Sequence, residues 1–343
     1  ITRFGRRHQV TLGGGRNQFV GWGLYGDTSY YTYKQQSYYL ARSYTFKPNE
    51  QYMGNMAYTY TAPSGFNLKF ASDYLQEKVS NKGNLQTWDP FNGAYVYDEY
   101  YHTKRSMNRL SLGGKLGKKG TWQNQNGFMV YNRVRNTYIK DMVTLEQQLS
   151  DRQGVQDTST FTDIYSRGSY SNNIGRFGYT LGYDINLQYA FSMKINERDK
   201  ELQDYAAYTN LSYDVVKDKL KVQAGFRGAY NTVYNPPVIP NINLLYAPTK
   251  KLQIRASYSE GYRAPLLKEL YLSFIDVDHH IIGNENLKPE SSKHVQLSAS
   301  YQIYEESNDY LQFIVTGYYN DVHNLIALAP LEPHNPRSIK YTY

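Results

Sequence analysis

The sequence predicts an all-β protein, and more narrowly a transmembrane antiparallel β-barrel. The mean hydropathy of -0.69 and the lack of a long apolar run exclude membrane-spanning helices, which need about 20 consecutive apolar residues. Tyrosine nevertheless occupies 38 of the 343 positions, an abnormal number for an ordinary soluble enzyme. Several segments alternate between apolar and polar residues, as strands do when one face meets lipid and the other meets water. A barrel reconciles these three observations.

The clearest strand lies between Tyr179 and Phe191. Its odd positions are apolar or aromatic and its even positions are small or polar, a period of two over a length that suits a tilted membrane strand. The same split recurs over residues 220–227, 252–259 and 294–303. Charged residues within these strands all take the polar parity. This matters because Arg or Lys facing lipid near the membrane midplane costs about 2–4 kcal/mol.

Turn signals divide the chain into strands joined alternately by short and long connections. Short turns rich in Gly, Asn, Pro or Lys are predicted at Gly13-Gly14-Gly15, Pro63-Ser64-Gly65, Gly117-Lys118-Lys119-Gly120, Asn172-Asn173, Lys217-Asp218, Pro248-Thr249 and Glu305-Glu306-Ser307-Asn308. Longer connections are predicted at residues 31–50, 79–94, 141–160, 193–203, 231–238, 259–291 and 329–337. Tight periplasmic turns and long extracellular loops are typical of outer-membrane barrels, and the scheme gives about 14 or 15 strands.

The connection from Ser259 to Ser291, here called the two-box loop, carries two motifs with a spacer between them. The first box is Tyr262-Arg263-Ala264-Pro265, followed by Leu267-Lys268-Glu269-Leu270-Tyr271, and the second is Gly283-Asn284-Glu285-Asn286-Leu287-Lys288-Pro289-Glu290. With these boxes the chain resembles a TonB-dependent outer-membrane receptor. Haem-type members usually show Phe-Arg-Ala-Pro, a histidine and then Asn-Pro-Asn-Leu. This chain has Tyr262 for Phe, Glu285 for Pro, and the adjacent pair His279 and His280.

The resemblance implies that residues 1–343 are part of a larger barrel. Plugged outer-membrane transporters have 22 strands, so we expect this chain to be a partial piece of such a barrel, with the plug domain and the last strands absent. Residues 338–343 read as the beginning of a strand. The implied location is the bacterial outer membrane. The implied partners are the TonB–ExbB–ExbD complex, acting through the missing N-terminal region, outer-membrane lipid and lipopolysaccharide, and, as in some relatives, a surface lipoprotein.

Two classes of function remain open. The first is energised uptake of a scarce metal chelate, with haem or an iron-siderophore favoured and cobalamin (vitamin B12) as the alternative. The second is a passive porin-like pore or an adhesion barrel, which would share the strand pattern but lack the plug and the two-box loop. In the first class haem, iron chelate or cobalamin is cargo, and no intrinsic cofactor is expected.

The candidate ligand-binding residues are His279, His280, Tyr262 and Arg263. A neutral histidine is a common axial ligand of haem iron, so His279 and His280 are the candidate metal ligands, with solvated loop residues as the alternative. Adjacent residues of an extended segment point in opposite directions, so at most one of the two should face the lumen. Arg263 binds either an anionic substrate group or a loop carboxylate such as Glu269. The other motif residues are expected to be mostly structural: Ala264, Pro265, Gly283, Asn284, Asn286, Leu287, Pro289 and Glu290.

Pro265 should hold Ala264 extended and suits the first turn of a short helix, in which Leu266, Leu267 and Leu270 fall at helical spacing.

Outside the loop the sequence mainly excludes other classes of function. The net charge of +8 is dispersed without a long basic run, so a nucleic-acid partner is not expected. A basic exterior near lipopolysaccharide phosphates, or a basic lumen, explains the charge more simply. No nucleophile elbow, phosphate-binding loop or His-Glu-x-x-His motif occurs, so an enzyme is not expected.

Overall fold

The computed structural model describes residues 2–24, 28–33, 36–86, 94–152, 154–195, 197–275, 280–306, 309–331 and 340–342. Their main element is an antiparallel 15-stranded sheet in which consecutive long strands pair with one another. Along its path lie β1 (Thr2–Phe4), β2 (His8–Phe19), β5 (Asn49–Thr61), β6 (Asn67–Leu85), β7 (Tyr95–Leu116), β8 (Gly120–Asp141), β10 (Asp157–Ile174), β11 (Phe177–Ser192), β12 (Asp199–Val216), β13 (Leu220–Asn231), β14 (Ile239–Tyr246), β15 (Leu252–Arg263), β18 (Glu290–Glu306) and β19 (Asp309–His323). Short β9 (Gln147–Leu149) pairs with β8.

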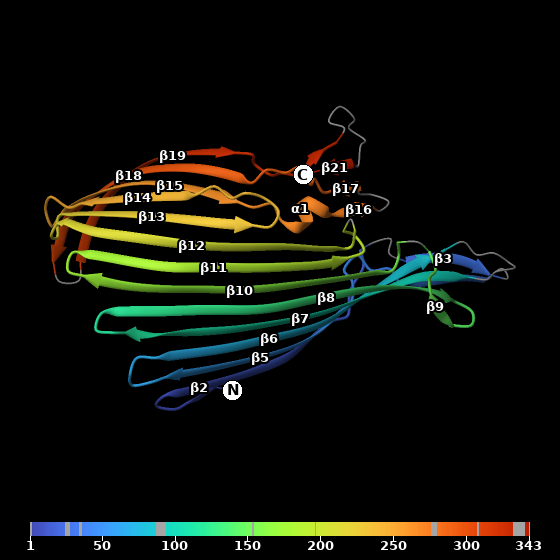
Figure 1. Ribbon diagram of the computed structural model, residues 1–343. Helices are drawn as coiled ribbons and strands as arrows, with labels where there is room; N and C mark the ends of the chain where they lie inside the picture. The colour runs from blue at the N-terminus through green and yellow to red at the C-terminus, as the bar shows by residue number, and fades with distance from the viewer. Residues whose placement is uncertain are drawn as a thin grey trace.

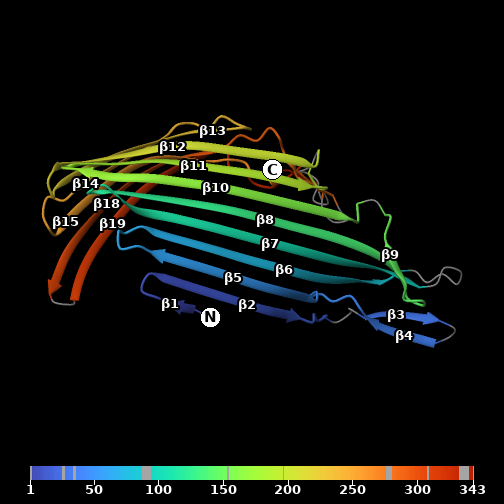
Figure 2. The ribbon, with the colours of Figure 1, turned by 60° about the horizontal axis from the view of Figure 1, so that its bottom comes forward.

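The sheet is curved and open, with β1 and β19 as its edge strands (Figures 1 and 2). Short turns join the strands at one end, and longer connections lie at the other (Figure 1). The expected fold class, a partial antiparallel barrel with about 14 or 15 strands, is therefore confirmed. No described helix has the length and apolar character of a membrane span.

The predicted two-sided character of the strands is visible in the exposure of their side chains. On β18 the odd positions point away from the concave side, and Val295, Leu297 and Ile303 are about half exposed. On β11 Leu181 and Tyr183 lie on the outer face, while Asp184 lies on the inner face and is only 16% exposed. Outer apolar residues and inner polar residues are what a membrane barrel requires.

Small elements gather at the end of the sheet that carries the long connections (Figure 1). They are the hairpin of β3 (Thr28–Tyr33) and β4 (Gln36–Ala41), the helix α1 (Leu267–Tyr271), and a four-stranded sheet of β16 (Ser273–Ile275), β17 (His280–Ile282), β20 (Ala329–Pro330) and β21 (Lys340–Thr342). The strand expected to begin at 338–343 is therefore β21. It does not extend the barrel sheet, because it pairs in parallel with β17 and antiparallel with β20.

Several predicted boundaries were wrong. Gly13, Gly14 and Gly15 form no turn, because β2 runs through them and pairs them with Asn55, Gly54 and Met53 of β5. A Cβ at Gly13 would lie 2.2 Å from the Asn55 side-chain oxygen, so close cross-strand approach explains at least this glycine. The turn placed at Asn172-Asn173 lies later, at Gly175, whose positive φ of 62° suits glycine.

Some predicted long connections also began too early, because the preceding strand continues into them. Residues 79–85 continue β6, and β7 and β8 each have 22 residues. Such strands are about twice the length that crosses a membrane, so they extend beyond the apolar band. The ends of these strands beyond the apolar band do not face lipid. Their sequences are therefore polar on both faces, lack the apolar–polar alternation and resemble loops.

Candidate functional site at the two-box loop

Arg263 joins the two boxes of the loop. It is the last residue of β15 and lies directly opposite Glu290, the first residue of β18. Its guanidinium donates through Nε and Nη2 to the two oxygens of Glu290, both at 2.9 Å, and through Nη1 to the two oxygens of Glu269, at 3.1 and 3.2 Å. The structure thus confirms the carboxylate partner expected for Arg263. We call Arg263, Glu269 and Glu290 the arginine clamp.

The clamp is partly shielded from water. The side chain of Arg263 is 40% exposed, whereas those of Glu269 and Glu290 are 9% and 15% exposed. Hydrogen bonds from Arg263 and from the backbone N–H of Ile326 lower the pKa of Glu290 below its ordinary value. The same two carboxylates raise the pKa of Arg263. Arg263 and Glu290 therefore carry charge at neutral pH, and the guanidinium is already bound by the two protein carboxylates.

The first box anchors α1 against the inside of the barrel. Pro265 is fully buried, and Glu269 accepts a hydrogen bond from the N–H of Leu266 at 2.8 Å, which caps the helix. Leu267 packs in a buried cluster with Ala190, Ile195 and Leu202. Ala190 and Leu202 share the inner parity of their strands with Asp184 and Asp204. The loop therefore folds inward, onto the lumen face of β11 and β12.

Two further contacts hold the loop against the inner face of the barrel. The N–H of Ser273 donates to the carbonyl of Lys194 at 2.6 Å, and the Lys200 ammonium lies 4.5 Å from the centre of the Tyr271 ring. The helical turn predicted after Pro265 is thus present. The sequence indicated neither its direction nor its partners between Ala190 and Leu202.

The second box packs directly against α1. The N–H of Gly283 donates to the carbonyl of Leu272 at 2.6 Å, and the N–H of Asn284 donates to the carbonyl of Glu269 at 2.9 Å. A Cβ at Gly283 would lie 2.6 Å from backbone atoms of Leu270, so only glycine fits without a shift.

The rest of the second box turns the chain back into β18. Asn284 accepts hydrogen bonds from the N–H groups of Asn286, through its side chain at 3.0 Å, and Leu287, through its carbonyl at 3.3 Å. The carbonyl of Pro289 accepts from the Asn324 side chain at 3.4 Å. Together the two boxes form one packed unit.

Tyr262 lies next to Arg263 in the sequence and contacts a carboxylate on the inner face of β12. Its hydroxyl donates to Asp204 Oδ2 at 3.2 Å. Asp204 also lies 3.6 Å from Arg227, which binds Asp184 at 3.2 Å. Asp184 in turn binds Arg167 at 2.8 Å. This inner charge ladder crosses β10 to β15.

Sequence reasoning missed the inner charge ladder. Asp184 and Arg227 stood out only as polar residues on the inner parity. Their pairing depends on the strand register, which places Arg167 opposite Asp184 and Tyr208 opposite Arg227. No local motif in the sequence encodes that register.

The histidine pair is only partly described. His279 lies in 276–279, outside the described residues. His280 opens β17, where its backbone pairs with Ile275 and Lys340. Within the described part of the chain, no group of three or more His, Cys, Asp or Glu residues is arranged to hold a metal ion. The haem-ligand role of His279 and His280 stays a prediction.

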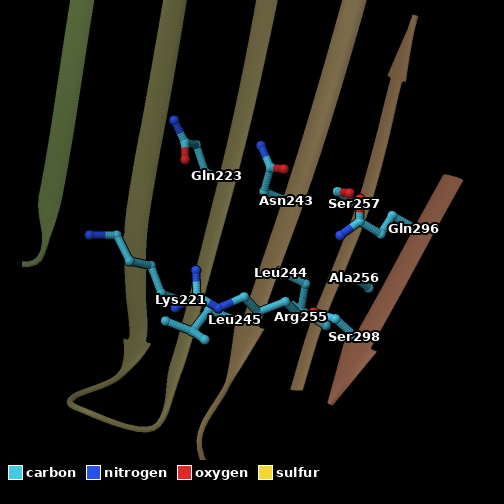
Figure 3. A pocket seen from close by; sticks show the side chains of 10 residues that line it. All are labelled: Lys221, Gln223, Asn243, Leu244, Leu245, Arg255, Ala256, Ser257, Gln296 and Ser298. Atoms are coloured by element: carbon cyan, nitrogen blue, oxygen red, sulfur yellow. The ribbon is translucent and has the colours of Figure 1, made fainter. Parts of the chain in front are cut away.

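A hollow of about 390 Å³ lies on the inner face of β13, β14, β15 and β18 (Figure 3). Register places two rows of side chains along it. The first row is Gln223, Asn243, Ser257 and Gln296, and the second, nearer the short turns, is Lys221, Leu245, Arg255 and Ser298. This wall offers amide, hydroxyl and cationic groups at the end of the sheet away from the two-box loop.

The chain belongs to a family described as "TonB dependent receptor-like, beta-barrel", whose model matches residues 2–339. One relative is the vitamin B12 transporter BtuB of Photobacterium profundum, which is 23% identical over 71% of this chain and 37% of its own length. Another is the heme/hemopexin utilization protein C of Haemophilus influenzae, 22% identical over 80% of this chain and 44% of its own length. The chain thus spans less than half of each of these relatives.

Solved structures show the same fold. A Serratia marcescens hemophore receptor HasR, in complex with its hemophore HasA and heme, aligns over all of this chain and 55% of its own, with a TM-score of 0.63 and 11% identity. A mutant of the Pseudomonas aeruginosa ferric enterobactin receptor PfeA, in complex with enterobactin, aligns over 96% and 51%, with a TM-score of 0.63 and 15% identity. Both likenesses concern the barrel architecture.

Proposed function

We propose that this chain forms most of the barrel of an outer-membrane receptor that actively takes up haem or an iron chelate. The plug domain and the remaining strands belong to other parts of the full-length protein. Energy comes from the TonB–ExbB–ExbD complex, which acts on the plug. The relatives named above support this proposal, because they are described as transporters, receptors and utilization proteins for haem, ferric enterobactin or vitamin B12.

The observation that carries the proposal is the inward fold of the two-box loop. The arginine clamp and the packing of Leu267 hold the loop across the inner face of β11 and β12. His280 follows on β17, directly before the second box. A cargo that enters the barrel therefore passes the packed boxes of this loop, and a histidine that precedes the second box in the sequence suits haem iron. The polar inner wall around Gln223 and Arg255 suits contact with a plug domain.

Cobalamin is the second candidate. It is favoured by two matches to vitamin B12 transporters, from Photobacterium profundum and from Vibrio vulnificus. A surface lipoprotein that delivers cargo to the loops is a further proposed partner, in line with the HasR complex, which contains a separate hemophore.

The test is a titration of the full-length receptor in detergent with haem and cyanocobalamin in parallel, followed by their visible absorption. We expect a saturable haem shift that is lost in the double variant His279→Ala/His280→Ala. His8→Ala is the matched control, because His8 lies on β2, far along the sheet, and pairs with the Tyr58 hydroxyl. Binding of cobalamin alone would move the function to vitamin uptake. Unchanged haem affinity in the double variant would remove both histidines as ligands.

A further inference from the structure

Six uncharged polar side chains lie together on the outer face of the sheet, where apolar residues are expected. All are partly exposed, and they are Ser72 of β6, Ser106 and Asn108 of β7, Asn124 and Asn126 of β8, and Ser166 of β10. We call them the polar belt. We propose that the polar belt is the contact by which two copies of this receptor pair side by side in the membrane. The inference rests on the proposed outer-membrane location.

Strand register places the polar belt on the outer face. Ser166 lies opposite Ile185, an apolar residue of the outer face of β11, and Asn126 lies opposite Ser166. Leu110 of β7 lies opposite Asn126, and Asn108, two residues away, has the same parity as Leu110. The belt therefore interrupts a surface that is otherwise apolar.

The polar belt lies within the apolar band of the barrel wall. A strand that rises about 3.3 Å per residue and tilts by about 40° gains roughly 2.5 Å of height per residue. Asn126 is six residues beyond Gly120, the start of β8, and so lies about 15 Å above the short turns. Ser72 is five residues beyond Asn67, the start of β6, and lies about 12 Å above them. Because the apolar band is about 25 Å tall, lipid tails rather than water meet these side chains.

Hydrogen bonds within the belt use only part of its capacity. Asn108 and Asn126 each accept a serine hydroxyl at 2.8 Å, from Ser72 and Ser166 respectively. The Nδ2 group of each donates one hydrogen to the belt residue two positions earlier on its own strand. An amide nitrogen carries two hydrogens, and among the described residues neither nitrogen makes a second hydrogen bond. Hydrocarbon offers no acceptor and leaves such a donor at a cost in free energy, so the belt needs polar partners at its own depth.

A second copy of the receptor supplies such partners at the right depth. Two copies inserted in the same direction can be related by a two-fold axis only when that axis runs along the membrane normal. Each residue then meets the partner at its own height, so that one belt faces the other. Amide and hydroxyl groups both donate and accept hydrogen bonds, so the uncharged belt is complementary to itself.

The position of the belt leaves its outer side open to a partner. Strands β6, β7, β8 and β10 lie in the middle of the sheet, where each is paired on both sides, away from the edge strands β1 and β19 (Figure 2). Further barrel strands would join at the edges and a plug would fill the lumen, so neither would cover the belt. Phe70, Leu110 and Phe128 lie beside the polar residues on the same face and add apolar area to the contact.

The first experiment measures pairing of the full-length receptor in liposomes, by energy transfer between labelled copies at increasing protein density. The variant is Asn108→Leu/Asn126→Leu. Its control is Gln203→Leu/Thr209→Val, which removes two polar side chains from the outer face of β12, outside the belt. A side-chain hydrogen bond within a membrane strengthens association about 2.8-fold, so the loss of two amides from each copy should weaken pairing about sixtyfold. The control should pair as the wild type does.

The second experiment identifies the partner by cross-linking in outer membranes, since this chain has no cysteine of its own. Leu110→Cys places a thiol beside Asn126 in the belt. Because a two-fold axis through the belt brings this position near its own copy, a short thiol-reactive cross-linker should give a product of twice the receptor mass. Leu181→Cys, on the outer face of β11, is the matched control and should give no such product.

Three results would overturn the inference. They are a receptor that stays monomeric at every density in lipid, equal pairing of the belt variant and the wild type, and a Leu110→Cys product that contains a different protein. The outcome is separable from the proposed uptake function. Haem titration of the belt variant should match the wild type, and a receptor that pairs normally but binds neither haem nor cobalamin would refute the proposed cargo alone.

Discussion

Replacing Arg263 with glutamine removes the cation that holds two shielded carboxylates together. Glu269 and Glu290 would each keep one backbone donor, the N–H of Leu266 and of Ile326. Breaking a buried ion pair from one side costs about 3–5 kcal/mol. A glutamate that has lost its cation can instead take up a proton, which at pH 7 costs about 3.7 kcal/mol. The loss of stability from each carboxylate cannot exceed this cost. Because the Arg263 side chain is 40% exposed, solvent screening reduces these figures, and we expect the loop to lose about 2–3 kcal/mol.

Hydrogen exchange followed by mass spectrometry measures this loss directly. The amides of Gly283 and Asn284 donate to carbonyls beside α1, so they exchange only when the loop opens. A loss of about 2–3 kcal/mol predicts exchange about thirty to a hundred and fifty times faster in Arg263→Gln. The control is Arg109→Gln, whose ion pair with Asp73 has both side chains 47% exposed and should contribute less than about 1 kcal/mol.

The pH dependence provides a second readout. The pKa of Glu290 is lowered in the folded loop from the ordinary value of 4.5, so its ionised form favours the folded state. That contribution is present above about pH 4.5 and is lost as the pH falls through the lowered pKa. The wild-type loop should therefore approach the behaviour of Arg263→Gln in acid. Equal exchange in both proteins at pH 7 would refute the reasoning.

Two further predictions concern the barrel wall and the second box. Leu181→Arg should hinder assembly into lipid vesicles by about 2–4 kcal/mol, because Leu181 has the outer parity near the middle of the apolar band, while Thr180→Arg should fold normally on the inner side; equal folding yields would contradict the assigned faces. Gly283→Ala should destabilise the loop by about 1–3 kcal/mol, since its Cβ would meet the backbone of Leu270 at 2.6 Å. Unchanged amide exchange at Asn284 in Gly283→Ala would show that the backbone yields without cost.

The strands and the class of fold could be predicted because their causes are local. A strand between lipid and water must alternate every two residues, so Tyr179 to Phe191 shows its two faces in the sequence alone. The turn after Pro63 and the helical turn after Pro265 follow from the restricted backbone of proline and glycine. The ion pair between Arg263 and Glu269 could also be predicted, because the two residues are six positions apart in the same loop.

The remaining features depend on the positions of residues far apart in the sequence. The run Gly13 to Gly15 has the composition of a turn, but pairing with β5 makes it part of a strand. Register selects Glu290 as the second partner of Arg263 and builds the ladder from Tyr262 through Asp204 to Arg227. The curvature of the sheet brings Leu267 onto Ala190 and Leu202. Alternation specifies which face a side chain takes, whereas the neighbours on that face are set by strand register and curvature, and these exist only in the folded sheet.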